Sequence, residues 1–430
     1  MLPQDLVHVV ARYVEAPDDV LSFLDALPAG SRGPSLGSLV ALATERPASA
    51  LWPRLVLSSV ASNRQRKWLC NAMRNHPCVE LDADALGLWV PHILPSTRLR
   101  MSIEKSHVDA LPDSILSALC ELEIMLDTPT SISVFACFLQ TLPRLRVLRL
   151  ECLWTSLDSP PRLEPLIAGP RQVWLESVGF SFQRGHVLSI ATVTAIAQFL
   201  SAQSVRDVSF RSVDVTPEAG DTLSAVLESS QSLQRLVLQE SHTLVAALTR
   251  TTRHLPHLKH LVLNDVSWRH LETLWSRLPA CMKGLSTLHL WLDHGRLNDD
   301  EFKRFVSVLG QLQLETLQLH AKNLLLNYPG RVALLLAALA PQRDLVALTL
   351  HFTMLSNDDI WTLAATLPCA VATLDLRYNA YNDASVDALL VLLQRPALRH
   401  VALAETLSHA AQDRLRATCP RPLRLTFDAK

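Results

Sequence analysis

Histidine is the residue type that most suggests chemistry in this sequence, because sixteen are present. Two of them, His320 and His351, are predicted to occupy the same position on successive parallel strands, with Cα atoms about 5 Å apart. Imidazoles at that separation could bind zinc. No acidic or Cys ligand stands in register with them. We therefore expect no metal site, and instead a column of solvated His side chains that contact a partner.

Motifs for catalysis or cofactor binding are not found in the sequence. It contains no G-x-x-x-x-G-K-[ST] or G-x-G-x-x-G phosphate loop, no H-E-x-x-H zinc motif and no G-x-S-x-G nucleophile elbow. Only 12 of the 430 residues are Gly, which is few for a phosphate-binding loop. We therefore expect a protein that is not an enzyme and that needs no cofactor.

A repeated unit, Leu-x-x-Leu-x-Leu, organises most of the sequence. With its variants it starts at positions from 52 to 420, in steps of 20 to 35 residues, about 26 on average. This spacing is within the range of leucine-rich repeats. Clear copies begin at Leu145, Leu233, Leu258, Leu285, Leu314, Leu345 and Leu398.

Each unit predicts one strand followed by one helix. The Leu-x-Leu alternation is typical of a short strand with one buried face. Asn298, Ser356 and Thr216 each precede an apolar stripe of helical period and are expected to cap a helix. Leu-Pro pairs such as Leu278-Pro279 are expected to end helices. Stacked units can bury a core that one unit cannot, so we predict an α/β leucine-rich-repeat solenoid, with a curved parallel sheet inside and helices outside.

The outward positions of the strands predict a concave surface that binds a partner. Trp174 and Trp291 are expected there, where a large aromatic side chain has no core to fill and suits a binding hot spot. Either Trp could instead fold over a neighbouring strand or lie under a loop. The predicted partner-binding residues are Arg149, Trp174, Arg211, His289, Trp291, Gln318, His320, His351, Asp375 and Arg377.

Residues 51–430 resemble the ribonuclease-inhibitor type of leucine-rich repeat, with about 14–15 repeats. That family also prefers Asn or Cys three residues after the last Leu of the unit. Only Asn379 fits here, and polar residues such as Ser241 and Thr353 stand at the same position elsewhere. The weak Asn ladder resembles the degenerate arrays of F-box proteins.

Residues 1–50 resemble an F-box. The Leu2-Pro3 start, the acidic break at Asp18-Asp19 and the Leu51-Trp52 pair carry the resemblance. In that family the module packs against the Skp-type adaptor of a cullin-RING ubiquitin ligase. The positions that match the family's adaptor-facing and core pattern are Leu2, Pro3, Leu6, Val9, Val10, Val14, Val20 and Leu21. A Gly/Pro/Ser stretch from Pro28 to Gly37 replaces the usual Cys and Trp.

The two resemblances imply the substrate receptor of an SCF-type ubiquitin ligase, with the adaptor on residues 1–50 and an unidentified target protein on the repeats. Two alternatives stay open. Residues 1–50 could be only a helical cap that shields the first repeat, which would leave a scaffold without a ubiquitin role. Similar repeats also occur in a family of small-GTPase regulators, which typically end in an acidic tail that this sequence lacks.

Composition limits the class of partner and the compartment. The formal net charge of -1 argues against a nucleic-acid binder. Eight scattered Cys without a C-x-x-C pair, and charged residues near the start of the sequence, predict a reduced protein of the cytoplasm, the nucleus or both. The uncharged run 187–205 has helical period and several polar residues, which favours a solenoid helix over a membrane span.

Overall fold

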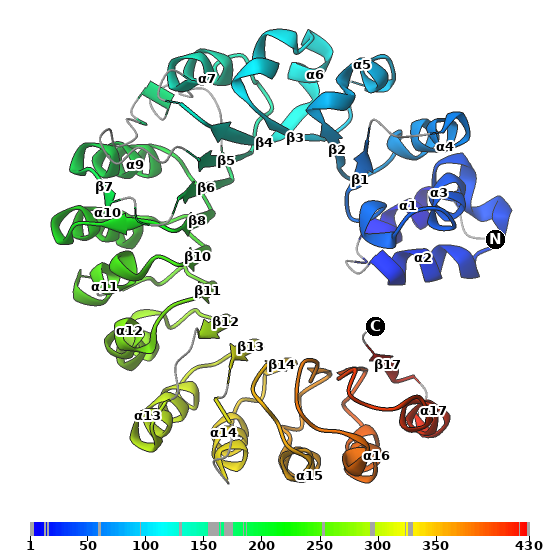
Figure 1. Cartoon of the computed structure of the whole chain (residues 1–430), viewed down its shortest axis with the longest axis vertical. Coiled ribbons are helices and arrows are strands. Elements are labelled where there is room, and N and C mark those ends of the chain that lie inside the picture. The colour runs from blue at the N-terminus through cyan, green and yellow to red at the C-terminus, as the bar shows by residue number, and fades with distance from the viewer. Residues whose placement is uncertain are drawn as a thin grey trace. The chain divides into compact units, whose positions relative to one another are not determined.

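The computed structural model describes residues 4–12, 14, 17–58, 62–94, 96–128, 131–153, 163, 165–166, 175–183, 185, 187–251, 254–292, 297–322, 324–325, 330–420 and 422–427. The chain divides into two compact units, Met1–Gln183 and Arg184–Lys430. Within each unit the strands of the main sheet lie along one side and helices lie on the other (Figure 1). We call the side of the sheet that carries no helices its helix-free face.

The first unit begins with three helices and continues as alternating strands and helices. Its strands pair in chain order, and every pairing is parallel. The helices are α1 (Gln4–Arg12), α2 (Pro17–Ala26), α3 (Ala29–Ala43), α4 (Asn63–Met73), α5 (Leu86–Trp89), α6 (Asp113–Ala118) and α7 (Ser131–Leu139). The strands are β1 (Leu55–Leu57), β2 (Val79–Asp82), β3 (Leu99–Ile103), β4 (Leu119–Leu126), β5 (Val147–Cys152) and β6 (Ser177–Phe182).

The second unit repeats one strand and one helix along most of its length. Its main strands are β8 (Asp207–Arg211), β10 (Arg235–Gln239), β11 (His260–Asn264), β12 (Thr287–Leu292), β13 (Thr316–Ala321), β14 (Ala347–His351), β15 (Thr373–Asp375), β16 (His400–Leu403) and β17 (Arg424–Phe427). They also pair in parallel and in this order, while β7 (Val187–Leu188) and β9 (Asp214–Val215) form a separate small pair. The helices are α9 (Ile190–Ala202), α10 (Pro217–Ser229), α11 (His242–Thr251), α12 (Trp268–Cys281), α13 (Asp299–Leu309), α14 (Arg331–Leu339), α15 (Asn357–Thr366), α16 (Val386–Leu393) and α17 (His409–Thr418).

The register of the strands follows the Leu pattern of the sequence. Leu288, Leu317 and Leu348 are paired across β12, β13 and β14, and each is 0% exposed. The intervening side chains therefore point to the helix-free face, because successive strand residues alternate between the two faces. The predicted α/β leucine-rich-repeat fold, a parallel sheet covered by helices on one side, is confirmed.

The helix caps are also confirmed at the positions expected from the sequence. Asn298 and Ser356 form capping boxes with Glu301 and Asp359, and Thr216 accepts a hydrogen bond from the N–H of Ala219. Each cap satisfies backbone N–H groups that have no partner inside the helix.

One expected helix end lies elsewhere. Leu278-Pro279 does not terminate α12, because this helix continues to Cys281 with Pro279 inside it. A proline so close to a helix C-terminus removes one hydrogen bond of the last turn and leaves the preceding turns intact. In contrast, α15 ends at Thr366, directly before the Leu367-Pro368 pair.

Buried polar side chains hold the loops after the strands, as the sequence predicts for Asn379. Its Nδ2 donates to the carbonyl oxygens of Leu350 and Leu376, at 2.6 and 3.0 Å, and its Oδ1 accepts from the N–H of Leu355 at 3.2 Å. Ser241 acts similarly, since its hydroxyl donates to the Gln239 carbonyl at 2.8 Å. Ser241 therefore replaces the Asn of the missing ladder in its own repeat.

None of the helices in the described part of the chain is long and apolar enough to cross a membrane. The uncharged run 187–205 forms β7 and α9, a helix of 13 residues.

Candidate functional site

An exposed apolar face on α1 is the first candidate binding surface. Val7 and Ala11 are buried, with 0% and 1% exposure. Leu6, Val9 and Val10 are instead 46%, 48% and 38% exposed. Solvent-facing positions of an amphipathic helix are normally polar. Three aliphatic side chains together on that side indicate a contact with another molecule. We call Leu6, Val9 and Val10 the α1 face.

The other residues expected to meet an adaptor are divided between the surface and the core. Val14 and Leu21 are partly exposed. Val20 has no exposed surface, so it stabilises the module from inside. The prediction that Val20 contacts an adaptor is therefore corrected: it is a core residue. Leu2 and Pro3 lie outside the described residues.

Trp52 and His76 join the N-terminal helices to the first repeat. The indole N–H of Trp52 donates to the carbonyl oxygen of Val14 at 2.8 Å. The Trp52 ring meets the His76 ring edge-on, with 5.1 Å between centroids. The two ring nitrogens of His76 lie 2.7 and 2.9 Å from the carbonyl oxygens of Cys78 and Leu51. The module that carries the α1 face is therefore packed directly onto the repeats that follow it.

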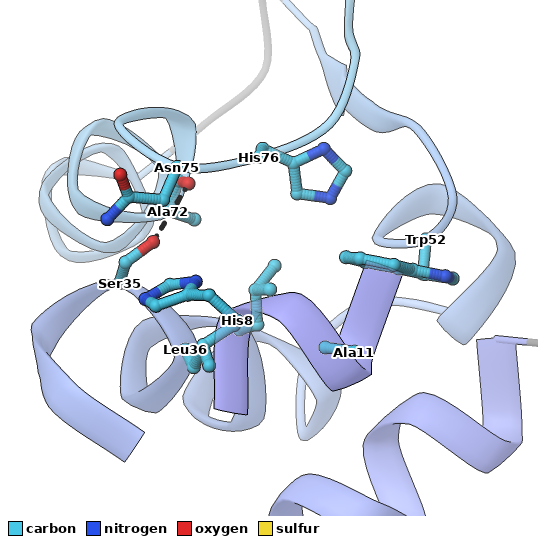
Figure 2. A pocket seen from close by; sticks show the side chains of 9 residues that line it. His8, Ala11, Ser35, Leu36, Trp52, Ala72, Asn75 and His76 are labelled. Carbon is cyan, nitrogen blue, oxygen red and sulfur yellow. Dashed lines mark hydrogen bonds between the residues drawn. The ribbon is translucent and has the colours of Figure 1, made fainter. Parts of the chain in front are cut away.

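A small cavity lies at the same junction (Figure 2). Its volume of about 10 Å³ accommodates one water molecule at most. The Ser35 hydroxyl, which lines it, donates to the carbonyl oxygen of Ala72 at 3.1 Å. The remaining lining residues are His8, Ala11, Leu36, Leu39, Trp52, Asn75 and His76. This cavity is a packing gap between the module and the repeats, too small for a ligand.

A second candidate surface lies on the helix-free face of the second unit. Trp291, His320 and His351 are paired in register across β12, β13 and β14, as the sequence predicts. The Trp291 and His320 rings stack, with 5.0 Å between centroids and an angle of 7°. His320 and His351 meet edge-on at 4.6 Å. Trp291 is 43% exposed, but His351 is only 7% exposed, so the expected column of solvated His side chains does not include His351.

Two further aromatic residues complete this surface, and the sequence analysis missed both. Phe352 and Tyr378 stack with 4.8 Å between centroids and an angle of 4°, and they are 40% and 41% exposed. His351 lies edge-on to both rings, which explains its burial. The Phe352 ring also lies 6.3 Å from the Trp291 ring. We call Trp291, His320, Phe352 and Tyr378 the aromatic patch.

The backbone conformation explains how Phe352 and Tyr378 reach the surface. Both have left-handed φ values, 55° and 59°, directly after the seventh position of their repeat. Earlier repeats have the same turn at Ser212, Glu240 and Asp265. Because bulky residues rarely adopt this conformation, aromatic side chains at two such turns are strained and point to a function. The eighth position of the repeat was thus the signal that could have identified them.

Asp375 lies beside the patch, and its carboxylate oxygens contact the side chains of Arg377 and His351. Arg377 donates to it from Nε at 3.0 Å and from Nη2 at 2.7 Å. The Nε2 atom of His351 lies 2.8 Å from Oδ1. Burial alone would raise the pKa of Asp375, but the nearby His351 and the hydrogen bonds from Arg377 outweigh burial and hold that pKa well below its usual range. Asp375 and Arg377 therefore cancel each other's charge at neutral pH.

Two histidines of this face, His289 and His320, are neutral at neutral pH. Burial, followed by the nearby Arg235, lowers the pKa of His289 to about 4. Burial, followed by the nearby His351, lowers the pKa of His320 to about 4. Gln318 is paired with His289 in register and is also partly buried. The predicted residues His289, Gln318 and His320 thus form a neutral polar surface next to Trp291.

Two further predicted contact residues, Arg211 and Arg149, lie on strands other than those of the aromatic patch. Arg211 is exposed on β8, which is separated from β12 by β10 and β11. Arg149 is exposed on β5, in the other unit of the chain. Trp174 lies outside the described residues.

The described residues include His, Cys, Asp and Glu side chains, which are the types that bind metals or act as nucleophiles. No three His, Cys, Asp or Glu side chains among them are arranged to hold a metal ion. All eight Cys are free thiols. Burial, helped by neighbouring Glu side chains, raises the pKa of Cys78 and of Cys152 to about 12, which keeps both thiols protonated and poorly nucleophilic.

No protein-family model matches the sequence, and no curated protein matches it. Among solved structures, a protein from Bacteroides fragilis is 12% identical, with 66% of this chain and 74% of that chain covered and a TM-score of 0.40. A chain from the complex of Rad7 and Elc1 in yeast is 14% identical, with 98% of this chain and 92% of that chain covered and a TM-score of 0.43. At these values we infer neither a function nor a partner from either structure.

Proposed function

We propose that this protein is a receptor that binds two other proteins and catalyses no reaction itself. Its α1 face would bind a Skp-type adaptor of a cullin-RING ubiquitin ligase, and its repeats would bind a target protein. The receptor would act by proximity, since holding a target near a ubiquitin-loaded enzyme raises the effective concentration of the reacting groups. Such a complex would operate in the cytoplasm or the nucleus.

The exposed α1 face is the observation that carries this proposal. Leu6, Val9 and Val10 are each about half exposed on a helix whose opposite side is buried. Covering the rest of each side chain would contribute about 1 kcal/mol. Together they would strengthen binding by roughly 100-fold. The F-box-like pattern of residues 1–50 places the same side chains at adaptor-facing positions.

Capture of a purified Skp-type adaptor by the immobilised full chain tests this proposal. The variant Leu6→Asp/Val9→Asp places two charges on the α1 face, and we expect it to lose capture. A matched control is Leu334→Asp/Val391→Asp, because these side chains are 49% and 51% exposed on α14 and α16. The control should retain capture. Circular dichroism would show that all three proteins are folded.

Two results would contradict the proposal. If the folded parent captures no adaptor, residues 1–50 are only a cap, and the protein is a scaffold without a link to ubiquitin. If the α1 variant and the control lose capture equally, the adaptor binds elsewhere. The alternative of a small-GTPase regulator predicts faster GTP hydrolysis when the full chain is added to candidate GTPases, which our proposal does not.

A further inference from the structure

The aromatic patch is uncharged at neutral pH. His320 is neutral because its lowered pKa of about 4 lies well below neutrality. Beside the patch, Asp375 and Arg377 are joined by hydrogen bonds of 2.7 to 3.1 Å, and the guanidinium carbon of Arg377 lies 5.8 Å from the centroid of the Tyr378 ring. A charged side chain buried against this surface would lose its hydration and meet no opposite charge to compensate. The patch therefore selects an uncharged segment.

The stacking of the rings decides which part of each ring is left for a ligand. Trp291 stacks on His320, and Phe352 stacks on Tyr378, so each pair uses one face of each ring internally. Aromatic faces are electron-rich and attract cations, whereas ring edges carry partial positive charge and attract oxygen atoms. The guanidinium of Arg377 already lies over the Tyr378 ring, where it would repel a second cation. The ring edges therefore favour carbonyl oxygens over cations as ligand groups.

Two polar groups of the patch are hydrogen-bond donors without a protein partner. Neither the indole N–H of Trp291 nor the hydroxyl of Tyr378 bonds to another residue in the described part of the chain. Both side chains are more than two-fifths exposed. Trp N–H groups only donate, and a Tyr hydroxyl donates readily to a carbonyl oxygen. The Nδ1 atom of His320 also has no partner among the described residues, but it is buried. The accessible polar groups of the patch are therefore donors, set beside flat apolar surface, and they need acceptors.

We propose that the aromatic patch binds an extended, uncharged, proline-containing segment of a partner protein. Proline supplies a carbonyl acceptor and has no N–H that would require an acceptor in return. Its apolar ring packs well against aromatic side chains, and a proline-rich segment is extended before it binds, which lowers the entropy lost on binding. This inference rests on the proposed function where it takes the segment to be part of the target protein. The binding of the segment itself requires no adaptor.

Fluorescence anisotropy with labelled decapeptides and the full chain tests this inference. The probes are decaproline, a Gly-Ser decapeptide and a Gly-Arg decapeptide, of which we expect only decaproline to bind. Trp291→Ala should weaken its binding by about tenfold or more. Tyr378→Phe, which removes only the hydroxyl, should weaken it several-fold. Trp361→Ala is the matched control, because Trp361 is 47% exposed on α15, and it should bind like the parent.

Several results would overturn the inference. Absence of decaproline binding by the folded parent would do so, as would preferential binding of the Gly-Arg peptide, which would indicate a cation-binding surface. Equal losses in Trp291→Ala and Trp361→Ala would show that the peptide binds without selecting the patch. Because no adaptor is present in this assay, its failure is distinct from a failure of adaptor capture.

Discussion

The α1 face and the aromatic patch are both exposed apolar surfaces, but they differ in chemistry. Leu6, Val9 and Val10 are aliphatic side chains without hydrogen-bonding groups, carried by a single helix. The aromatic patch is assembled from successive repeats and includes hydrogen-bond donors. An aliphatic helix face binds by fitting into an apolar groove. Aromatic rings with polar edges can also donate hydrogen bonds to the backbone of an extended segment. One molecule thus carries two surfaces suited to different partners.

The largest expected effect is on stability, and it distinguishes the exposed α1 face from the core of the same helical module. Val20→Asp should destabilise the first unit by about 4 kcal/mol or more, because it buries an unpaired charge where the parent side chain is 0% exposed. Leu6→Asp should change stability by only about 0.5 kcal/mol. Urea unfolding followed by circular dichroism measures both. Similar losses in the two variants would mean that Leu6 is part of the core.

A pH-dependent effect of intermediate size is expected in the second unit. The folded pKa of His289, about 4, lies below its ordinary value of about 6.5. The neutral form therefore stabilises the fold fully above pH 6.5, and this contribution is lost as the pH falls from about 6.5 through about 4. In His289→Gln the Tm should decline less over this range than in the parent. Parallel Tm profiles of the two proteins would contradict the assigned burial of His289.

The smallest expected effect concerns Phe352, whose left-handed φ of 55° is strained for a bulky residue. Phe352→Asn loses the stack with Tyr378 but relieves this strain, because Asn tolerates the conformation. We expect a net change in the free energy of unfolding below about 1 kcal/mol, together with loss of decaproline binding. Urea unfolding and anisotropy measure the two quantities. A large destabilisation would show that Phe352 supports the fold rather than a partner.

The repeat fold could be predicted from the sequence because it depends on local patterns. The Leu spacing determines the strand register, and residues such as Asn298 and Ser356 determine where helices begin. These features need only the residues of one repeat and its neighbours. The continuation of α12 past Pro279 was not predicted, because a proline in the last turn of a helix destabilises that helix only slightly.

The binding surfaces were only partly predictable because burial depends on contacts between repeats. Trp291 and His320 were expected at the surface and are partly exposed there, but His351 is covered by Phe352 and Tyr378. Those two aromatics follow the strands in left-handed turns, which strand alternation does not describe. Val20 matched the family pattern for both core and contact positions, and only the packing of the helices assigns it to the core.

Hydrogen–deuterium exchange of the full chain, with and without a purified Skp-type adaptor, tests the central claim most directly. We predict slower exchange in α1 and in the adjoining part of α2 when the adaptor is present, with no change in β12–β15. Protection confined to β12–β15, or no protection in α1 at saturating adaptor, would contradict the assignment of the α1 face as the adaptor-binding surface.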